Sequence, residues 1–382
     1  MDGSYERVRL RFILGPPIKK NKLMKKTIIL AIILSVSTAI LAGNPDRIGQ
    51  AGATQLNING WGRSSGWGWA SVSSVKGLES VYNNIGGLAH TNNTEIIFSR
   101  TSWLLGSDIN INTFGFAQNI GGSGGLGVSI MSYDLGEIPI TTYEQPDGGI
   151  GTYKPRFTNI TAAYSKRFTQ EISGGIGVKV FSESITNAKA QGVALDAGIQ
   201  YITTLRKTSK VKNNDVKFGV SLKNIGPDAR YAGDGLSTKL QNPLKEVEYT
   251  VNQRSAKFNL PTLMNISASY DLRLDKNDET YFHRFTPAFT FTNNAFANNQ
   301  FTLGAEYAYK SMFQVRVGYA YEDGITSYET RVNAFTGIMG GFTFEVPLKK
   351  ESANTFGLDY SYRHSNPFGG SHSFGVRLSL GE

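Results

Sequence analysis

Apolar and polar residues alternate one by one over many long segments of this 382-residue chain. Between residues 301 and 309, Phe, Leu, Ala, Tyr and Tyr take the odd positions, and Thr, Gly, Glu and Ala take the even ones. Side chains point alternately to the two faces of a strand, so this period of two predicts β-strands with one apolar and one polar face. We therefore expect an all-β protein.

About fourteen segments follow this pattern. Their approximate bounds are 95–103, 109–118, 125–135, 157–168, 173–183, 192–203, 216–224, 262–273, 281–292, 300–310, 312–322, 333–346, 354–364 and 371–380. Their lengths are near the roughly 9 to 11 residues that a tilted strand needs to cross a bilayer, and the number is even, as in bacterial outer-membrane barrels. Strands of soluble sandwiches or propellers are usually nearer 5 to 6 residues, so the pattern favours a membrane barrel over these alternatives.

The connections between these segments alternate in length. Connections 119–124, 169–172 and Lys310–Ser311 are short, and they follow even-numbered strands. The two longest, 136–156 and 225–261, follow odd-numbered strands. Short periplasmic turns opposite longer extracellular loops are typical of outer-membrane barrels.

The N-terminal segment reads as a secretory leader. Lys25 and Lys26 precede an apolar run over residues 28–41, which ends in Ala42 and Gly43. This arrangement predicts a leader over residues 1–42, and residues 1–23 read as an over-extended start because Met24 opens a conventional signal sequence. Residues 1–42 hold 8 of the 39 Lys and Arg but only 2 of the 30 Asp and Glu. The net charge of +9 is thus concentrated there and does not indicate nucleic-acid binding.

Catalytic and metal-binding motifs find little support. The chain has no cysteine, which excludes disulfides, thiolate metal sites and a lipidated N-terminal cysteine. The glycine run 121–127 matches nucleotide-loop and nucleophile-elbow spacing, but a strand pattern follows it where both motifs need a helix, so we interpret it as a turn. A hydrolase built on Ser371, His364 and His372 is not selected by their spacing. We expect no enzyme, no metal and no cofactor.

Charged residues recur on the polar strand faces. They are Lys179, Asp196, Asp271, Arg273, Glu306, Arg316, Asp359, Arg363 and Arg377. Facing lipid, Arg or Lys would cost roughly 2 to 4 kcal/mol near the midplane, so we expect these side chains to face the lumen. They form either an ion-paired interior that fixes the barrel shape, which we favour, or the lining of a selective pore.

The longest connection carries more apolar residues than a solvated loop needs. They are Tyr231, Leu236, Leu240, Leu244, Val247 and Tyr249. Long loops of this kind are often functional, so we expect this one to bind partner proteins. The alternative is a lid that folds over the barrel mouth.

Several stretches resemble a known family. Residues 62–70 (GRSSGWGWA) and 80–89 (SVYNNIGGLA) are similar to the N-terminal signature of the PorV/PorQ outer-membrane proteins. Residues 220–227 (VSLKNIGP), 357–363 (GLDYSYR) and 369–378 (GGSHSFGVRL) also match, the last two most closely to the PorV branch. Ile85 and Gly86 stand where the family usually has Pro and Ala, which leaves room for a paralogue with another partner.

This resemblance implies a FadL-like barrel of fourteen strands over residues 91–382, in the outer membrane of a Gram-negative bacterium, with residues 43–90 as a plug-like segment in or under the lumen. It also implies a non-enzymatic component of the type IX secretion system. The implied partners are the SprA/Sov-type translocon barrel, secreted cargo recognised through C-terminal domains, attachment-complex proteins and outer-membrane lipid.

The alternative function is a FadL-type channel for hydrophobic small molecules. Such a channel should show an apolar lumen pocket and a lateral opening in the wall. The predicted strand interiors are mostly polar, charged or glycine, which favours the secretion component.

Overall fold

A computed structural model describes residues 45–204, 215–242, 247–275, 282–349 and 353–381. The leader predicted over residues 1–42 lies outside the described residues. Among the described residues, no helix combines the length and the apolar character needed to cross a membrane.

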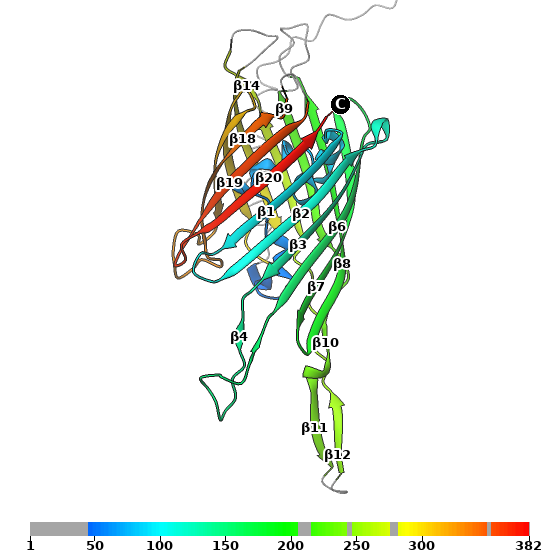
Figure 1. The fold of residues 1–382 in the computed structure, drawn as a ribbon, viewed down its shortest axis with the longest axis vertical. Helices are drawn as coiled ribbons and strands as arrows, with labels where there is room; N and C mark the ends of the chain where they lie inside the picture. The colour runs from blue at the N-terminus through cyan, green and yellow to red at the C-terminus, as the bar shows by residue number, and fades with distance from the viewer. Residues whose placement is uncertain (1–44, 205–214, 243–246, 276–281, 350–352, 382) are drawn as a thin grey trace, which may run out of the picture. The chain divides into compact units, whose positions relative to one another are not determined.

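Fourteen long antiparallel strands close into a barrel (Figure 1). They are β1 (Thr94–Trp103), β2 (Ile109–Asn119), β3 (Gly125–Asp134), β6 (Arg156–Arg167), β7 (Ile172–Ile185), β8 (Ala188–Thr203), β9 (Val216–Ile225), β13 (Leu263–Tyr270), β15 (His283–Asn294), β16 (Gln300–Tyr309), β17 (Phe313–Glu322), β18 (Phe335–Pro347), β19 (Thr355–Ser365) and β20 (Ser371–Leu380). Neighbours in sequence are neighbours in the sheet, and the pairs β1–β20 and β8–β9 complete the ring. The predicted all-β outer-membrane barrel with fourteen strands is confirmed.

Short strands complete the structure outside the main wall. β10 (Tyr231–Ala232) adds to β8, and β14 (Leu272–Arg273) extends the pairing of β13 with β15. Two hairpins belong to the long connections, β4 (Ile138–Pro139) with β5 (Thr152–Tyr153), and β11 (Ser237–Asn242) with β12 (Val247–Asn252).

The alternation in sequence becomes the two faces of the wall. On β16 and β17, Leu303 is 59% exposed and Val317 is 57% exposed, whereas Thr302 and Arg316 are buried. Exposed apolar side chains recur on the outer face of every long strand pair in this way, as a wall in contact with lipid requires.

The barrel has two distinct rims. We call the end at which β1 begins and β20 ends the terminal rim, and the opposite end the loop rim. The terminal rim carries tight turns such as Lys310–Ser311, where both residues have positive φ (51° and 56°) as in a type I′ hairpin. The connections that contain β4–β5 and β10–β12 leave from the loop rim (Figure 1).

The segment before β1 lies within the ring of strands, and we call residues 45–90 the plug. It consists of short helical turns, η1 (Pro45–Arg47), η2 (Thr54–Asn57), η3 (Ser64–Gly66), η4 (Gly68–Ser73), α2 (Ser80–Asn83) and η5 (Ile85–His90). It starts near the loop rim, where the Gly52 N–H donates to the Asn259 carbonyl at 3.1 Å. It ends near the terminal rim, where His90 Nε2 lies 3.2 Å from Ser173 Oγ.

An apolar core joins the plug to one side of the barrel. Trp61, Leu78 and Leu88 of the plug are at most 1% exposed and cluster with Ile97 and Ile111 of β1 and β2. Burying a large apolar side chain contributes about 1.5 to 3 kcal/mol, so this core helps to hold the plug in the lumen.

Candidate functional site

Buried ion pairs fill much of the lumen, and one cluster lies directly beside this apolar core, because Arg377 is paired in register with Ile97. Arg377 on β20 lies 2.5 Å from Asp359, 3.5 Å from Glu79 and 3.7 Å from Glu95. Glu79 belongs to the plug and also accepts the Ser64 N–H at 2.9 Å. One wall arginine therefore fixes both neighbouring strands and the plug.

A second cluster surrounds Glu306 on β16. Its two carboxylate oxygens receive Arg284 at 2.5 Å and Arg316 at 2.6 Å. Arg316 also donates to Thr343 on β18 at 2.8 Å, so the cluster links β15, β16, β17 and β18 across their inner faces.

A third cluster lies on β7, β8 and β9. Lys179 Nζ is 2.9 Å from Asp196 Oδ2 and 2.7 Å from Asn224 Oδ1. Lys223 Nζ lies 3.7 Å from the same Asp196 oxygen and 3.9 Å from the centre of the Tyr82 ring of the plug. Buried cations here have a carboxylate, an amide and an aromatic face as partners.

The remaining predicted lumen charges also lie on the inner face. Asp271 accepts from Lys217 at 2.6 Å. Arg273 is paired in register with Arg284 and so shares its face of the sheet. The Arg363 guanidinium lies 4.7 Å from the Trp103 ring and 4.9 Å from the Phe335 ring.

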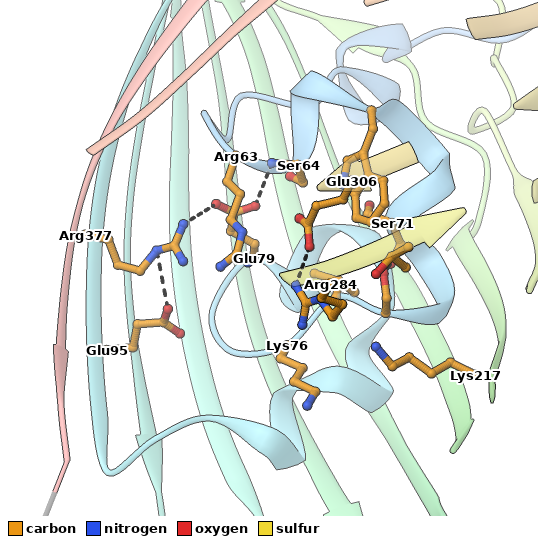
Figure 2. A pocket seen from close by; sticks show the side chains of 14 residues that line it. Arg63, Ser64, Ser71, Lys76, Glu79, Glu95, Lys217, Arg284, Glu306 and Arg377 are labelled. Carbon is orange, nitrogen blue, oxygen red and sulfur yellow. Dashed lines mark hydrogen bonds and ion pairs between the residues drawn. The ribbon is translucent and has the colours of Figure 1, made fainter. Parts of the chain in front are cut away.

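A polar cavity of about 160 Å³ lies between the plug and the wall (Figure 2). Its lining includes Arg63, Lys76, Lys217, Arg284 and Arg377 against Glu79, Glu95 and Glu306. The wall residues come from the ends of β1, β9, β15, β16 and β20 nearest the terminal rim. We call this space the terminal cavity.

A larger cavity of about 430 Å³ lies toward the loop rim, and we call it the loop-rim cavity. Its apolar and aromatic lining is Ile58, Trp69, Trp103, Leu263, Phe296, Ile325, Val332, Phe335, Ile338 and Met339. Trp69 and Ile58 belong to the plug, and most of the others lie at strand ends or in loops. The apolar surface thus comes from segments outside the alternating strand interiors.

The strand pairing beside the loop-rim cavity is irregular. Pairing of β17 with β18 stops at Tyr319 with Ile338, although β17 continues to Glu322. β18 has a register shift against β19 between Phe335 and Met339, and Gly337 within it has a φ of +89°. The lining combines Met339, which is buried in the lumen, with Ile338, which is 57% exposed on the outer face.

A thin part of the plug separates the two cavities. Trp67 lines the terminal cavity, whereas Gly68 and Trp69 line the loop-rim cavity. This part lies against two glycines of the wall. A Cβ atom added at Gly304 would be 2.6 Å from the Ala70 Cβ, and a Cβ atom added at Gly318 would be 3.0 Å from the Trp67 Cα. The glycines let the plug backbone approach the wall closely.

Two plug side chains have strongly lowered pKa values. Part of the Lys76 side chain is exposed, but desolvation inside the barrel, with repulsion from Lys217, lowers its pKa to about 8. Burial, with repulsion from Lys76 and Arg167, lowers the pKa of His90 to about 4. Desolvation is the larger cause in both cases, and the nearby cations add to it.

The residues expected to bind partners lie mainly on the β11–β12 hairpin. Leu240, Val247 and Tyr249 are 45–56% exposed. In a lid packed against the barrel mouth, such apolar side chains would be buried. Tyr231 is held at the rim, where its hydroxyl donates to Glu183, and Leu236 is half-buried in η7 (Asp234–Leu236). Leu244 lies outside the described residues.

The serine–histidine arrangement considered for a hydrolase does not form. His364 contacts Thr336 at 2.8 Å and His372 contacts Tyr360 at 2.9 Å, whereas Ser371 Oγ accepts the Leu104 N–H at 2.9 Å. Among the described residues no group of acidic or histidine side chains could hold a metal ion.

Sequence reasoning missed several charged residues of the lumen. Lys217 and Lys223 occupy alternate positions on β9 opposite exposed Phe218 and Val220, so strand alternation could have found them. Lys76 and Glu79 of the plug could not be found in this way, because the short helical turns of the plug do not produce a repeating pattern of apolar and polar residues.

Comparison with solved structures identifies the fold. The toluene transporter TbuX of Ralstonia pickettii matches with a TM-score of 0.50 at 12% identity, over 85% of this chain and 99% of that one. The toluene transporter TodX of Pseudomonas putida matches with a TM-score of 0.50 at 11% identity, over 84% and 97%. No family model and no curated protein matches the sequence. The chain therefore has the fourteen-stranded, FadL-like fold of an outer-membrane β-barrel.

Proposed function

We propose that this protein is an outer-membrane channel for hydrophobic small molecules. The observation that carries the proposal is the loop-rim cavity, which has an aromatic lining and lies beside the point where the pairing of β17 with β18 ends. A channel of this kind takes an apolar molecule from one side and releases it through the barrel or its wall. The apolar lining of this cavity supports the proposal, because the alternating strand interiors alone did not predict such a pocket.

The size and chemistry of the cavity suit a small apolar ligand. Its volume of about 430 Å³ lies within the roughly 300 to 1,000 Å³ of ordinary ligand pockets. Trp69, Trp103 and Phe335 offer ring faces, while Asn294, Asn298 and Glu322 supply a few polar groups. TbuX and TodX, two structures with a similar fold, are described as toluene transporters, which supports the same class of cargo here.

Binding of toluene to the purified barrel in detergent tests the proposal. Because Trp69 and Trp103 line the cavity, tryptophan fluorescence should change saturably as toluene is added. Ile338 lines the cavity, so Ile338→Trp should crowd it and weaken binding by roughly tenfold, whereas Ile199→Trp, on the outer face of β8 and 56% exposed, should leave binding unchanged. Non-saturable partitioning, or equal affinity in both variants, would argue against a channel.

A second candidate function is the secretion role that the resemblance to the PorV/PorQ family implies. The β11–β12 hairpin favours it, because Leu240, Val247 and Tyr249 are exposed on two strands whose outer edges are unpaired. Exposed edges and apolar side chains are typical of surfaces that pair with another chain. The proposed partners remain the SprA/Sov-type translocon, cargo C-terminal domains and attachment-complex proteins.

Removal of the hairpin tests this second function. A short glycine linker in place of residues 238–251 would keep the bridge between Ala229 and Phe258, which anchors the loop base. Barrel insertion should persist, and co-purification of a translocon or cargo should fall. Unchanged co-purification and secretion would remove the hairpin from any such role.

A further inference from the structure

The terminal cavity holds two cations that have no carboxylate partner. Arg377, Arg284 and Lys217 each pair with a carboxylate at 2.5–2.6 Å. Among the described residues, the only hydrogen bond from Arg63 to a side chain goes to the neutral Gln314 amide at 2.7 Å. Lys76 makes no hydrogen bond or ion pair with any residue that the structure describes. Both side chains point into the cavity from the plug (Figure 2).

The carboxylates that line the cavity are already engaged. Glu306 accepts from Arg284 and Arg316. Glu79 accepts the Ser64 N–H and Arg377, and Glu95 accepts the Leu78 N–H at 2.6 Å. Neither Arg63 nor Lys76 forms a direct ion pair with these carboxylates, and Arg63 acts on Glu306, Asp359 and Glu95 only at longer range.

The pKa of Lys76 is lowered mainly by desolvation, and nearby cations lower it further. The charged groups facing it are Lys217 with its partner Asp271, and Arg284 and Arg167. Three of these four are cations, so the ammonium group is both partly desolvated and repelled. A bound anion would relieve this repulsion.

We propose that the terminal cavity is a binding site for a phosphate-class oxyanion. A phosphate carries about −1.5 to −2 charge at pH 7, so it can interact at once with both cations that have no direct ion pair. Lys76 offers three N–H donors and Arg63 a planar fork of five, so several phosphate oxygens can be bonded at once. The volume of about 160 Å³ is sufficient for such a group with a few waters.

This inference goes beyond the proposed channel. The oxyanion site faces the terminal rim and is separated by the plug from the apolar cavity that carries the channel proposal. Either site can therefore be abolished while the other is measured. The phosphate could belong to a soluble molecule or to a lipid head group, since the same donors recognise both.

Calorimetric titration of the folded mature protein with inorganic phosphate tests the site, with chloride as the control ion. Lys76→Gln removes a charge without breaking any contact between described residues, so it should fold normally and bind phosphate about tenfold or more weakly. Arg63→Gln should have a similar effect. Lys154→Gln, on an exposed loop, is the matched control and should bind as the wild type does.

A second arm distinguishes the source of the phosphate. The protein in nanodiscs of phosphatidylcholine, with or without phosphatidic acid, would be examined by native mass spectrometry for retained lipid. Binding of free phosphate, of phosphatidic acid, or of both, reduced by Lys76→Gln, would support the site and identify the source. Absence of saturable binding in both arms, or equal binding by the wild type and Lys76→Gln, would overturn it.

Discussion

Gly304 on β16 and Ala70 of the plug are in such close contact that a Cβ atom at position 304 would lie 2.6 Å from the Ala70 Cβ. The lack of a side chain at Gly304 also leaves room for the Trp67 ring, because a Cβ atom at position 304 would lie 3.3 Å from the Trp67 Cε3. The plug part between the two cavities is therefore held by shape complementarity to the wall.

Gly304→Leu should push this part of the plug away from the wall. Overpacking of this kind costs about 1 to 3 kcal/mol, and the loosened plug should become accessible to trypsin after Arg63 and Lys76. Cleavage would be followed by mass spectrometry of the fragments. The matched control is Gly340→Leu on β18, where a new Cβ meets nothing closer than the Arg316 carbonyl at 3.4 Å. Equal cleavage of both variants would show that the glycine contact does not hold the plug.

The wall of this barrel was predictable from the sequence because its cause is local. Each of the fourteen predicted segments overlaps an observed strand within a few residues, since the alternation of lipid-facing and inward side chains is imposed residue by residue. Gly337 and the register shift beside it were not predictable, because a bulge changes the pairing without disturbing the apolar pattern.

The lumen was harder to predict than the wall. The strand interiors read as polar, which favoured a filled interior without an apolar pocket. The apolar cavity arises because Trp69 and Ile58 of the plug meet Trp103 and Phe335 from strand ends. These contacts join residues far apart in sequence through a segment that has no period, so no pattern within one strand records them.

Acid should loosen the plug at the terminal rim. His90 Nδ1 accepts from Arg167 at 3.2 Å, so the neutral ring fits the docked plug, and its pKa is lowered from 6.5 to about 4. At pH values between 4 and 6.5, His90 binds a proton more readily in the released plug than in the docked plug. Docking therefore weakens as the pH falls from 6.5 to 4. The expected loss is roughly 1 to 3 kcal/mol. Proteolysis of the plug across this pH range would measure it.

His90→Gln is the control for this pH effect. An amide can still accept from Arg167 and donate to Ser173, but it does not titrate. The variant should therefore lose the pH dependence between 6.5 and 4 while keeping a docked plug at neutral pH. A variant that stays as acid-sensitive as the wild type would assign the effect to other groups.

The outer face of β17 should reject a charge. Val317 is 57% exposed near the middle of the strand, so Val317→Arg places a guanidinium against lipid at a cost of about 2 to 4 kcal/mol. Val317→Leu keeps the face apolar and should assemble normally. Folding yield into lipid vesicles compares the two, and equal yields would mean that this face is turned away from lipid. The inward neighbour Gly318 is unsuitable as a control because it touches Trp67.

Arg377→Gln should strongly destabilise the barrel, because Arg377 serves three buried carboxylates at once. Without it, Asp359, Glu79 and Glu95 remain in the lumen with less compensation, and breaking a buried pair in this way typically costs 3 to 5 kcal/mol. Urea unfolding of the vesicle-folded protein would measure the loss. The double variant Arg377→Gln, Glu79→Gln removes one stranded charge and should recover part of the stability, as mutual dependence of the two residues requires. The opposite outcome is that the losses in unfolding free energy of the two single variants add up to the loss of the double variant. That result would mean that Arg377 stabilises the barrel through packing and that the ion pair with Glu79 does not hold the plug to the wall.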